Sequence, residues 1–221
     1  RAGLQLDARL AVGGYGSREA SAGVRGAAGG WDYAATLSAE RTDGVSALRP
    51  NDQFGNYNPD RDGSTLDAAQ LRLGFAPATG HRVGLTLLRT SLNTQYDSAE
   101  YAPPTYMPDA SPDFRTHART TVAALDWRGP LAAGLRGSAR ASRSVDDARN
   151  GGNQTDRFRT TRQQVQAQVA WQTGVLGQLV AALENNDDRA TSTSYTAGAQ
   201  RRNSAVALEL TGNAAAFSWQ A

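Results

Sequence analysis

The chain has 221 residues, 39% of them hydrophobic, and a formal net charge of +2, with acids and bases scattered along its length. No run approaches the roughly 18 apolar residues of a membrane-spanning helix, which excludes helical insertion, and the scattered charge gives no sign of a nucleic-acid-binding surface. The sequence has no cysteine and only two histidines, His81 and His117, so thiol chemistry is excluded and a zinc site built on Cys and His is disfavoured.

Taken in chain order, short segments of alternating apolar and polar residues follow one another along the whole sequence. Successive side chains of a β-strand point to opposite faces, so each segment predicts a strand with one apolar face. The predicted strands cover residues 4–12, 20–25, 31–40, 69–75, 83–87, 121–127, 135–141, 162–172, 179–183 and 206–210, and a further one begins at residue 217. These are about ten strands and a stub, near the roughly ten-residue length of a tilted bilayer-crossing strand.

The alternation is clearest in residues 162–174. One face of this predicted strand is apolar and the other is a row of glutamines: Val165, Ala167, Val169 and Trp171 against Gln164, Gln166, Gln168 and Gln172. A soluble sandwich turns such an apolar face inward, whereas a membrane barrel turns it outward to lipid and encloses water.

The connections between the predicted strands help to decide between these two folds. After the first hairpin they alternate between short turns and long polar excursions, which are predicted at residues 42–65, 93–114, 146–156 and 185–203. In an antiparallel meander, all the short turns then lie at one end of the sheet and all the long loops at the other. Short periplasmic turns and long external loops are typical of outer-membrane barrels.

The large aromatic residues follow the same sorting. Six of them sit beside short turns and are predicted to lie at one level of the sheet: Trp31, Phe75, Trp127, Trp171, Phe217 and Trp219. Tryptophans that fill a core would not be confined to one end, so we interpret them as an aromatic girdle at a membrane interface. The predicted fold is therefore an all-β, antiparallel, up-and-down transmembrane β-barrel, with residues 1–221 forming one domain that is part of a larger barrel.

The positions of the arginines agree with this orientation. Arg72, Arg136 and Arg140 fall on the polar parity, which avoids the cost of roughly 2–4 kcal/mol for an arginine on the lipid face at mid-bilayer. Arg89 and Arg143 fall on the apolar parity near the long-loop end, where that cost is small. We expect them to contact outer-membrane lipid, namely the saccharolipid of the outer leaflet.

Clustered acids in the first two long excursions form the candidate site. Asp60 and Asp62 are separated by one residue, and Asp97, Asp109 and Asp113 lie in the second excursion. Two carboxylates at this spacing can converge on one hard cation, and calcium takes six to eight oxygen ligands from such loops. An EF-hand is excluded, because the twelfth position counted from Asp60 falls in a strand. The alternative is that Asn-Pro-Asp and Asp-Gly are ordinary turn sequences.

Several of these segments together resemble a known family. They are Trp31 to Arg41, the Asn58-Pro59-Asp60-Arg61-Asp62-Gly63 loop, Leu85 to Leu88 leading to Tyr96-Asp97, Asp113-Phe114-Arg115, and Gln200 to Asn203. In this order they resemble the barrel of TonB-dependent outer-membrane receptors, and within that family the cobalamin (vitamin B12) transporters. The resemblance covers nearly the whole chain and begins at the first barrel strand. It implies the N-terminal half of the barrel, without the plug domain or the TonB-contacting segment of the family.

The resemblance also implies a function and a set of site residues. In this family, acids of two neighbouring external loops bind calcium, which orders the loops for substrate capture. The matching positions are Asp60, Asp62, Tyr96 and Asp97, with Asp113, for which Asp109 is an alternative, and Asp43 as a sixth.

The expected activity is TonB-dependent import of cobalamin across the bacterial outer membrane, without enzymatic chemistry. A siderophore or haem receptor is the alternative within the family, and a passive porin or structural barrel is the alternative outside it. An outer-membrane lipase or protease would need a serine–histidine or acid pair facing the lumen, and the sequence indicates none.

Overall fold

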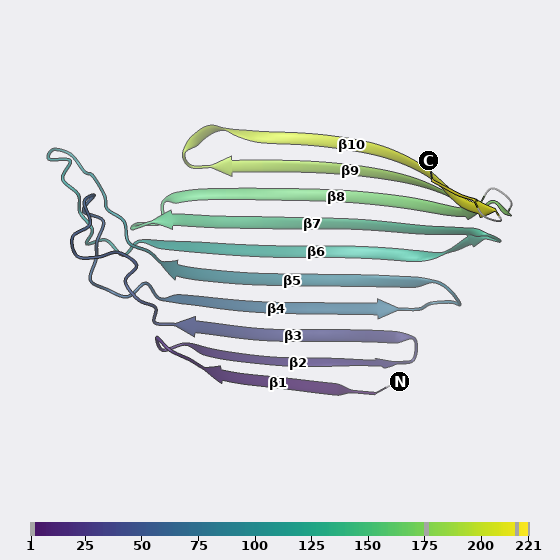
Figure 1. The fold of residues 1–221 in the computed structure, drawn as a ribbon, viewed down its shortest axis with the longest axis horizontal. Coiled ribbons are helices and arrows are strands. Elements are labelled where there is room, and N and C mark those ends of the chain that lie inside the picture. Colours follow the sequence, from purple (N-terminus) through teal and green to yellow (C-terminus); the bar gives the residue numbers. More distant parts are fainter. Residues whose placement is uncertain (1–2, 175–176, 215–216, 221) are drawn as a thin grey trace.

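The computed structural model describes residues 3–174, 177–214 and 217–220. Eleven strands form one antiparallel sheet, and their order in the sheet is their order in the sequence (Figure 1). This confirms the predicted all-β, up-and-down topology, and β11 is the further strand that was predicted to begin at residue 217. The sheet is open, with β1 and β11 at its two edges. Among the described residues there is no helix of the length and apolarity needed to cross a membrane.

Except for β1, the first ten strands are longer than the apolar segments that predicted them. Their bounds are β1 Gln5–Val12, β2 Arg18–Ala28, β3 Trp31–Thr42, β4 Ser64–Phe75, β5 Arg82–Gln95, β6 Arg115–Ala132, β7 Leu135–Gly151, β8 Asp156–Gln172, β9 Gln178–Ser192, β10 Tyr195–Ala214 and β11 Phe217–Gln220. Each of them pairs with its sequence neighbours, so the sheet is a series of consecutive hairpins.

The register places most of the large apolar residues on one face, called here the apolar face. Val165 of β8, for example, pairs with Ala141 of β7, and Leu183 of β9 pairs with Val206 of β10. This face is uncovered: Leu125, Val165 and Leu183 expose 55%, 57% and 58% of their surface. The opposite face, called the polar face, carries the glutamines of β8.

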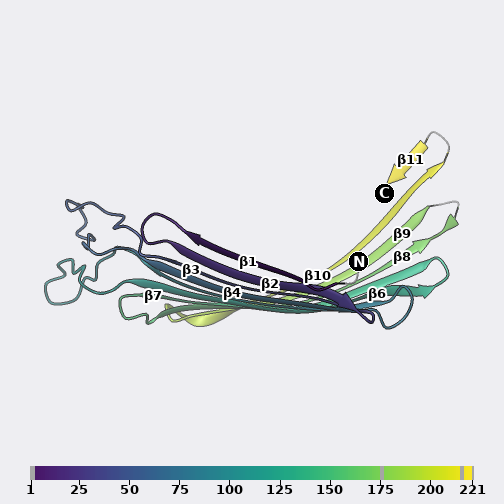
Figure 2. The ribbon, with the colours of Figure 1, turned by 90° about the horizontal axis from the view of Figure 1, so that it is seen from below.

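Because the sheet is a single curved layer (Figure 2), it has no dry interior. Within the part of the chain that the structure describes, Phe114 and Ala124 are the buried hydrophobic residues. The apolar face therefore does not meet a second sheet, as it would in a soluble sandwich.

The tryptophans lie where the sequence places them, at the short-turn end and on the apolar face. Trp31 pairs with Phe75 in register, and their rings stack with centroids 4.4 Å apart. Trp171 and Trp219 lie beside later short turns, with Trp219 opposite Gly212. Trp127 lies five positions before the end of β6, opposite Val83 at the start of β5. Phe217 is also predicted to lie at this end, but its side chain is not among those that the structure describes.

Two of the four predicted long loops are long in the structure, and the other two are not. Residues 43–63 and 96–114 form long loops that extend beyond the sheet at one end (Figure 1). The predictions of a loop at 146–156 and at 185–203 are wrong. There β7 continues to Gly151, β8 begins at Asp156, and β9 and β10 continue to a turn at residues 193–194. The predicted turn at Gly129-Pro130 also lies within β6, which ends at Ala132 after a bulge.

Cross-strand ion pairs explain why these polar segments are strands. Asp188 of β9 accepts hydrogen bonds from Arg162 of β8, at 2.6 Å and 3.2 Å, and from Arg201 of β10 at 2.9 Å. On the other face, Asp147 of β7 pairs with Arg157 of β8. Opposite charges directly across a strand pair stabilise a sheet, so a polar sequence can extend the ladder beyond the apolar region.

Candidate metal centre

The two long loops meet each other above strands β3 to β6, because those strands are neighbours in the sheet. The hydroxyl of Tyr101 in the second loop donates a hydrogen bond to the carbonyl oxygen of Phe54 in the first, at 2.9 Å. Ser46 in the first loop donates to Asp97 in the second, at 3.3 Å. The loops therefore form one unit at the long-loop end.

Three carboxylates converge in this unit. One oxygen of each of Asp60, Asp62 and Asp97 lies within 4.8 Å of the other two. Asp60 and Asp62 come from the first loop and Asp97 from the second, so the cluster joins the two loops. Asp60 is exposed, while Asp62 and Asp97 are half-buried. No other group of three or more such residues is found within the described ranges.

Backbone groups of the first loop fix two of these carboxylates. Asp97 accepts hydrogen bonds from the amides of Leu48 at 3.1 Å and Asn58 at 3.3 Å, and Asp62 accepts one from the amide of Ala47 at 2.9 Å. The segment 46–48 therefore passes over the cluster and holds it together. Three carboxylates offer up to six oxygens, which is enough for the coordination that calcium requires.

The electrostatics of the cluster favour a bound cation. Burial raises the pKa of Asp62 above its ordinary value. The amide of Ala47 opposes this rise, and the negative charges of Asp97 and Asp60 add to it. A divalent cation would reverse the repulsion among the three carboxylates, because it would be the largest local charge in the site.

This raised pKa leads to a prediction for Asp62→Asn. A carboxyl with a raised folded-state pKa stabilises the folded loop at low pH, and that stabilisation is lost as the pH rises through the folded-state pKa. At neutral pH without calcium, Asp62→Asn should therefore resist proteolysis of residues 43–63 better than the wild type, because it removes one repelling charge and keeps an acceptor for Ala47. Calcium should then add no protection, whereas it should protect the wild type. Limited proteolysis at pH 5 and pH 7.5, with and without calcium, measures both effects.

The other three predicted ligands are placed elsewhere. The hydroxyl of Tyr96 accepts a hydrogen bond from the amide of Gly151 at 3.2 Å, next to the ring of Phe114. Asp43 is exposed and lies beside Gly16 in the β1–β2 turn. Of the six residues predicted from the sequence, the structure brings together Asp60, Asp62 and Asp97.

Asp113 is the third predicted ligand outside the cluster. It accepts hydrogen bonds from Arg115 at 2.6 Å and from Gln95 at 3.1 Å. Burial raises the pKa of Asp113, but these two donors outweigh burial and hold that pKa below its usual value. Its alternative, Asp109, accepts a hydrogen bond from the amide of Ser111. Both acids are therefore already engaged by local donors.

Further residues that shape the site were not predicted from the sequence. Ser46 and the amides of Ala47, Leu48 and Asn58 contribute most of the hydrogen bonds to the cluster. The segment 46–48 carries no acid and no metal-binding motif, so only its contacts with Asp62 and Asp97 identify it.

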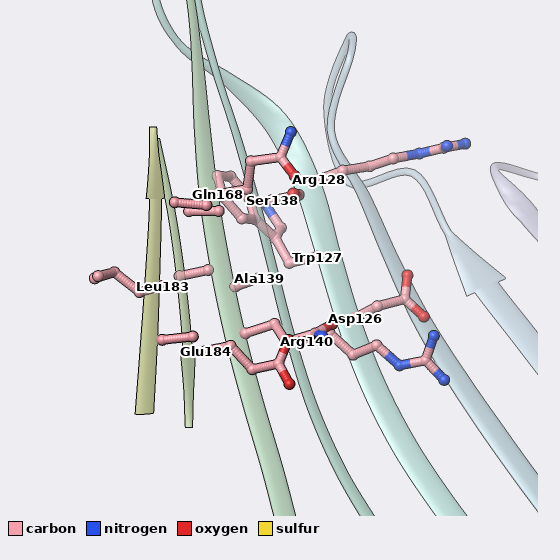
Figure 3. Close-up of a pocket in the computed structure, with 14 residues that line it drawn as sticks. Asp126, Trp127, Arg128, Ser138, Ala139, Arg140, Gln168, Leu183 and Glu184 are labelled. Carbon is pink, nitrogen blue, oxygen red and sulfur yellow. Dashed lines mark hydrogen bonds between the residues drawn. The ribbon is translucent and has the colours of Figure 1, made fainter. Parts of the chain in front are cut away.

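A groove of about 470 Å³ crosses strands β6 to β10, and its charged residues lie on the polar face (Figure 3). Asp126, Arg140 and Glu184 line it, so both signs of charge are present. Glu184 accepts hydrogen bonds from Gln164 at 3.2 Å and Gln166 at 2.9 Å. No histidine is among the residues that line the groove. Apolar side chains, among them Trp127 and Leu183, make up the other half of the lining, so the groove is mixed in character.

Comparison with known proteins adds no identity to this geometry. A scan against known protein families finds none that matches the sequence, and a search among curated proteins finds no relative.

Proposed function

We propose that the chain forms part of the barrel of a TonB-dependent outer-membrane receptor that imports cobalamin, with lipid against its apolar face and water against its polar face. External loops ordered by calcium would capture the substrate. The observation that carries this proposal is the cluster of Asp60, Asp62 and Asp97, which joins two long loops at one end of a sheet with one apolar face.

The uncovered apolar face supports the membrane location. A water-soluble sheet buries its hydrophobic face against another layer, and this sheet has no second layer among its described residues. Hydrocarbon would cover the exposed Leu125, Val165 and Leu183, and the tryptophans would lie at the interface nearest the short turns. A strand of about 9–11 residues crosses a bilayer, so the 17 residues of β8 would project well beyond it.

The acidic cluster supports a loop-ordering role for calcium. Its ligands come from both long loops, so one ion would fix the position of one loop relative to the other. The cluster would be extracellular in a barrel with short periplasmic turns, and extracellular calcium sites work in the range of about 10⁻⁴–10⁻³ M. Loops that are mobile without the ion and fixed with it would couple calcium binding to ligand binding.

The resemblance to the cobalamin transporters supports the choice of substrate and of TonB as the energy-coupling partner. The charged and amide residues of the groove, such as Asp126, Arg140 and Glu184, support a water-filled interior, because they lie on the polar face and would face the lumen. A siderophore or haem receptor would share these features and would differ in the ligand that its loops retain.

The test is binding of radiolabelled cyanocobalamin to outer membranes that contain the protein, in calcium and in EGTA. We expect EGTA to weaken binding by about tenfold or more, within the usual range of coupling between two ligands. Asp60→Asn combined with Asp97→Asn should reproduce the effect of EGTA in the presence of calcium. Asp109→Asn, which alters an exposed acid of the second loop outside the cluster, is the matched control and should bind as the wild type does.

The same assay separates the alternatives. Retention of a ferric siderophore or haem in place of cobalamin would assign the other branch of the family. Diffusion of small solutes without retention of any ligand would indicate a passive barrel. Equal cobalamin binding in calcium and in EGTA would contradict the ordering of the loops by calcium, but it would still support the proposal of a cobalamin receptor.

A further inference from the structure

The charged residues of β5 to β10 are sorted unequally between the two faces. On the polar face, six arginines accompany six acids: Arg82, Arg128, Arg136, Arg140, Arg162 and Arg201 with Asp126, Asp146, Asp156, Glu184, Asp188 and Glu209. The apolar face of the same strands carries nine arginines and two aspartates. This face therefore holds a surplus of positive charge in a chain with a net charge of only +2.

These nine arginines form a continuous region, called here the arginine belt. They are Arg89, Arg115, Arg119, Arg143, Arg149, Arg157, Arg159, Arg189 and Arg202, and Asp147 and Asp187 lie among them. They lie toward the long-loop end of their strands, beyond most of the apolar residues; Val145 follows Arg143 on the same face. Arg115 is paired with Asp113 of the second loop.

The belt is densest around Asp147 of β7. Arg119 of β6 and Arg159 of β8 are the register partners of Asp147 on its two sides. Arg157 pairs with Asp147 through its guanidinium, and Arg149 lies directly opposite Arg157. Four arginines therefore surround one aspartate, and we call these five residues the Asp147 cluster.

This arrangement is unfavourable unless an anion is present. Like charges directly opposite each other on neighbouring strands destabilise a sheet, and Arg149 and Arg157 are such a pair. Asp147 can neutralise only one of the four guanidinium groups. Arg119, Arg149 and Arg159 are exposed, so their donors are available to an external ligand. Guanidinium groups bind phosphate with two parallel hydrogen bonds, which makes phosphate a suitable anion.

Asp187 repeats the pattern farther along the sheet. It accepts hydrogen bonds from Arg189 at 3.2 Å, from Arg202 at 3.3 Å and from Gln200 at 3.0 Å. Its register partners are Gln163 and Arg202, and Arg143 lies opposite Gln163. Asp187 holds the side chains of Arg189 and Arg202 against the sheet, and its single negative charge cannot neutralise both of them.

The height of the belt can be compared with the thickness of a bilayer. Arg119 lies eight positions from Trp127 in β6, and Arg159 lies twelve positions from Trp171 in β8. At a rise of about 3.4 Å per residue and a tilt of about 40°, these separations correspond to about 20 Å and about 30 Å along the membrane normal. The apolar band of an outer-membrane barrel is about 25 Å tall, so the Asp147 cluster would lie at the headgroups opposite the tryptophans.

We propose that the arginine belt, centred on the Asp147 cluster, binds the phosphate groups of a phosphorylated glycolipid in the outer leaflet of the membrane. This inference rests on the membrane orientation given under the proposed function. The belt lies on the lipid-facing side, continuous with the apolar face. A ligand held there must therefore have an acyl part in the bilayer and an anionic headgroup at its surface, as a lipid does and a soluble anion does not.

The test compares two triple variants with the same change in charge. The belt variant combines Arg119→Gln, Arg149→Gln and Arg159→Gln. The control variant combines Arg136→Gln, Arg162→Gln and Arg201→Gln on the polar face of β7, β8 and β10. Each protein is placed in phosphatidylcholine nanodiscs with diphosphoryl lipid A, and bound lipid is counted by native mass spectrometry. We expect the belt variant to lose lipid A binding by about tenfold or more, and the control variant to retain it.

A lysine variant, competition with inorganic phosphate and a check of nanodisc insertion complete the experiment. Replacing the same three belt residues with lysine should restore part of the binding, because the charge is kept and the bidentate geometry is lost. Equal binding by the belt and control variants would overturn the proposal while leaving the barrel intact. Displacement of lipid A by millimolar inorganic phosphate would also overturn it, because the site would then be one for a soluble anion. If the unmodified protein does not enter nanodiscs, the proposed function fails first, and that result is seen before any lipid is counted.

Discussion

Arginine at position 165 should prevent stable insertion of the sheet into a bilayer, whereas arginine at position 166 should be tolerated. Val165 exposes 57% of its surface on the apolar face of β8. It lies six positions from Trp171, which corresponds to about 15 Å along the membrane normal and so to the middle of the bilayer. An arginine there costs roughly 2–4 kcal/mol. The folded fraction of each variant in phosphatidylcholine vesicles, measured by equilibrium urea denaturation, gives the difference.

Gln166 is the matched control for this experiment. It is the next residue of the same strand and points to the polar face, where its register partners are Glu184 of β9 and Arg140 of β7. An arginine there would face Glu184, which offsets the repulsion from Arg140. Gln166→Arg adds the same charge with almost no change in depth. If Val165→Arg and Gln166→Arg were equally stable in vesicles, the apolar face would not be in contact with lipid, and the membrane orientation would have to be abandoned.

Calcium should protect both long loops from proteases, and Asp97→Asn should remove that protection. Asp97 is the proposed ligand from the second loop, and it accepts hydrogen bonds from Ser46, Leu48 and Asn58 of the first loop. Binding to the closed arrangement stabilises it by mass action, so calcium well above its dissociation constant should slow cleavage at residues 43–63 and 96–114 by about tenfold or more. The cleavage rates are measured by mass spectrometry of the fragments.

Asp113→Asn is a suitable control for the calcium experiment. It removes an acid of the same loop whose carboxylate is engaged by Arg115 and Gln95. Its loops should remain protected by calcium. Loss of protection in Asp113→Asn together with full protection in Asp97→Asn would place the ion away from the Asp60, Asp62 and Asp97 cluster.

The sheet could be predicted from the sequence because most of its apolar residues recur with a period of two. Val165 and Gln164 illustrate this, since a shift of the register by one residue would exchange the apolar and polar faces of the whole strand. Hydrophobic pattern and turn residues together therefore identified the topology. The strand ends were not predictable in the same way, because Asp147 and Asp188 extend their strands through ion pairs with partners far away in sequence. Such pairs leave no periodic pattern in a single segment.

The candidate site was predictable only in part, for a related reason. Asp60 and Asp62 lie two residues apart, so their side chains can share a direction, and loop proximity brings Asp97 to them. Tyr96 precedes Asp97 directly, and neighbouring side chains of an extended chain diverge, which takes its hydroxyl to Gly151 instead. Asp113 has a local partner in Arg115. A resemblance in sequence does not reveal such competing local bonds.

The nearest-neighbour order of the strands restricts how the molecule can grow or shrink in evolution. Because every strand pairs only with the strands before and after it, loss or duplication of a complete hairpin leaves the remaining strands antiparallel and still joined by short connections. Loss of a single strand would make its former neighbours run in the same direction, and parallel neighbours need a crossover of a dozen or more residues that a tight turn cannot supply. The sheet can therefore become wider or narrower in steps of two strands, while the apolar residues stay on one face and the polar residues on the other.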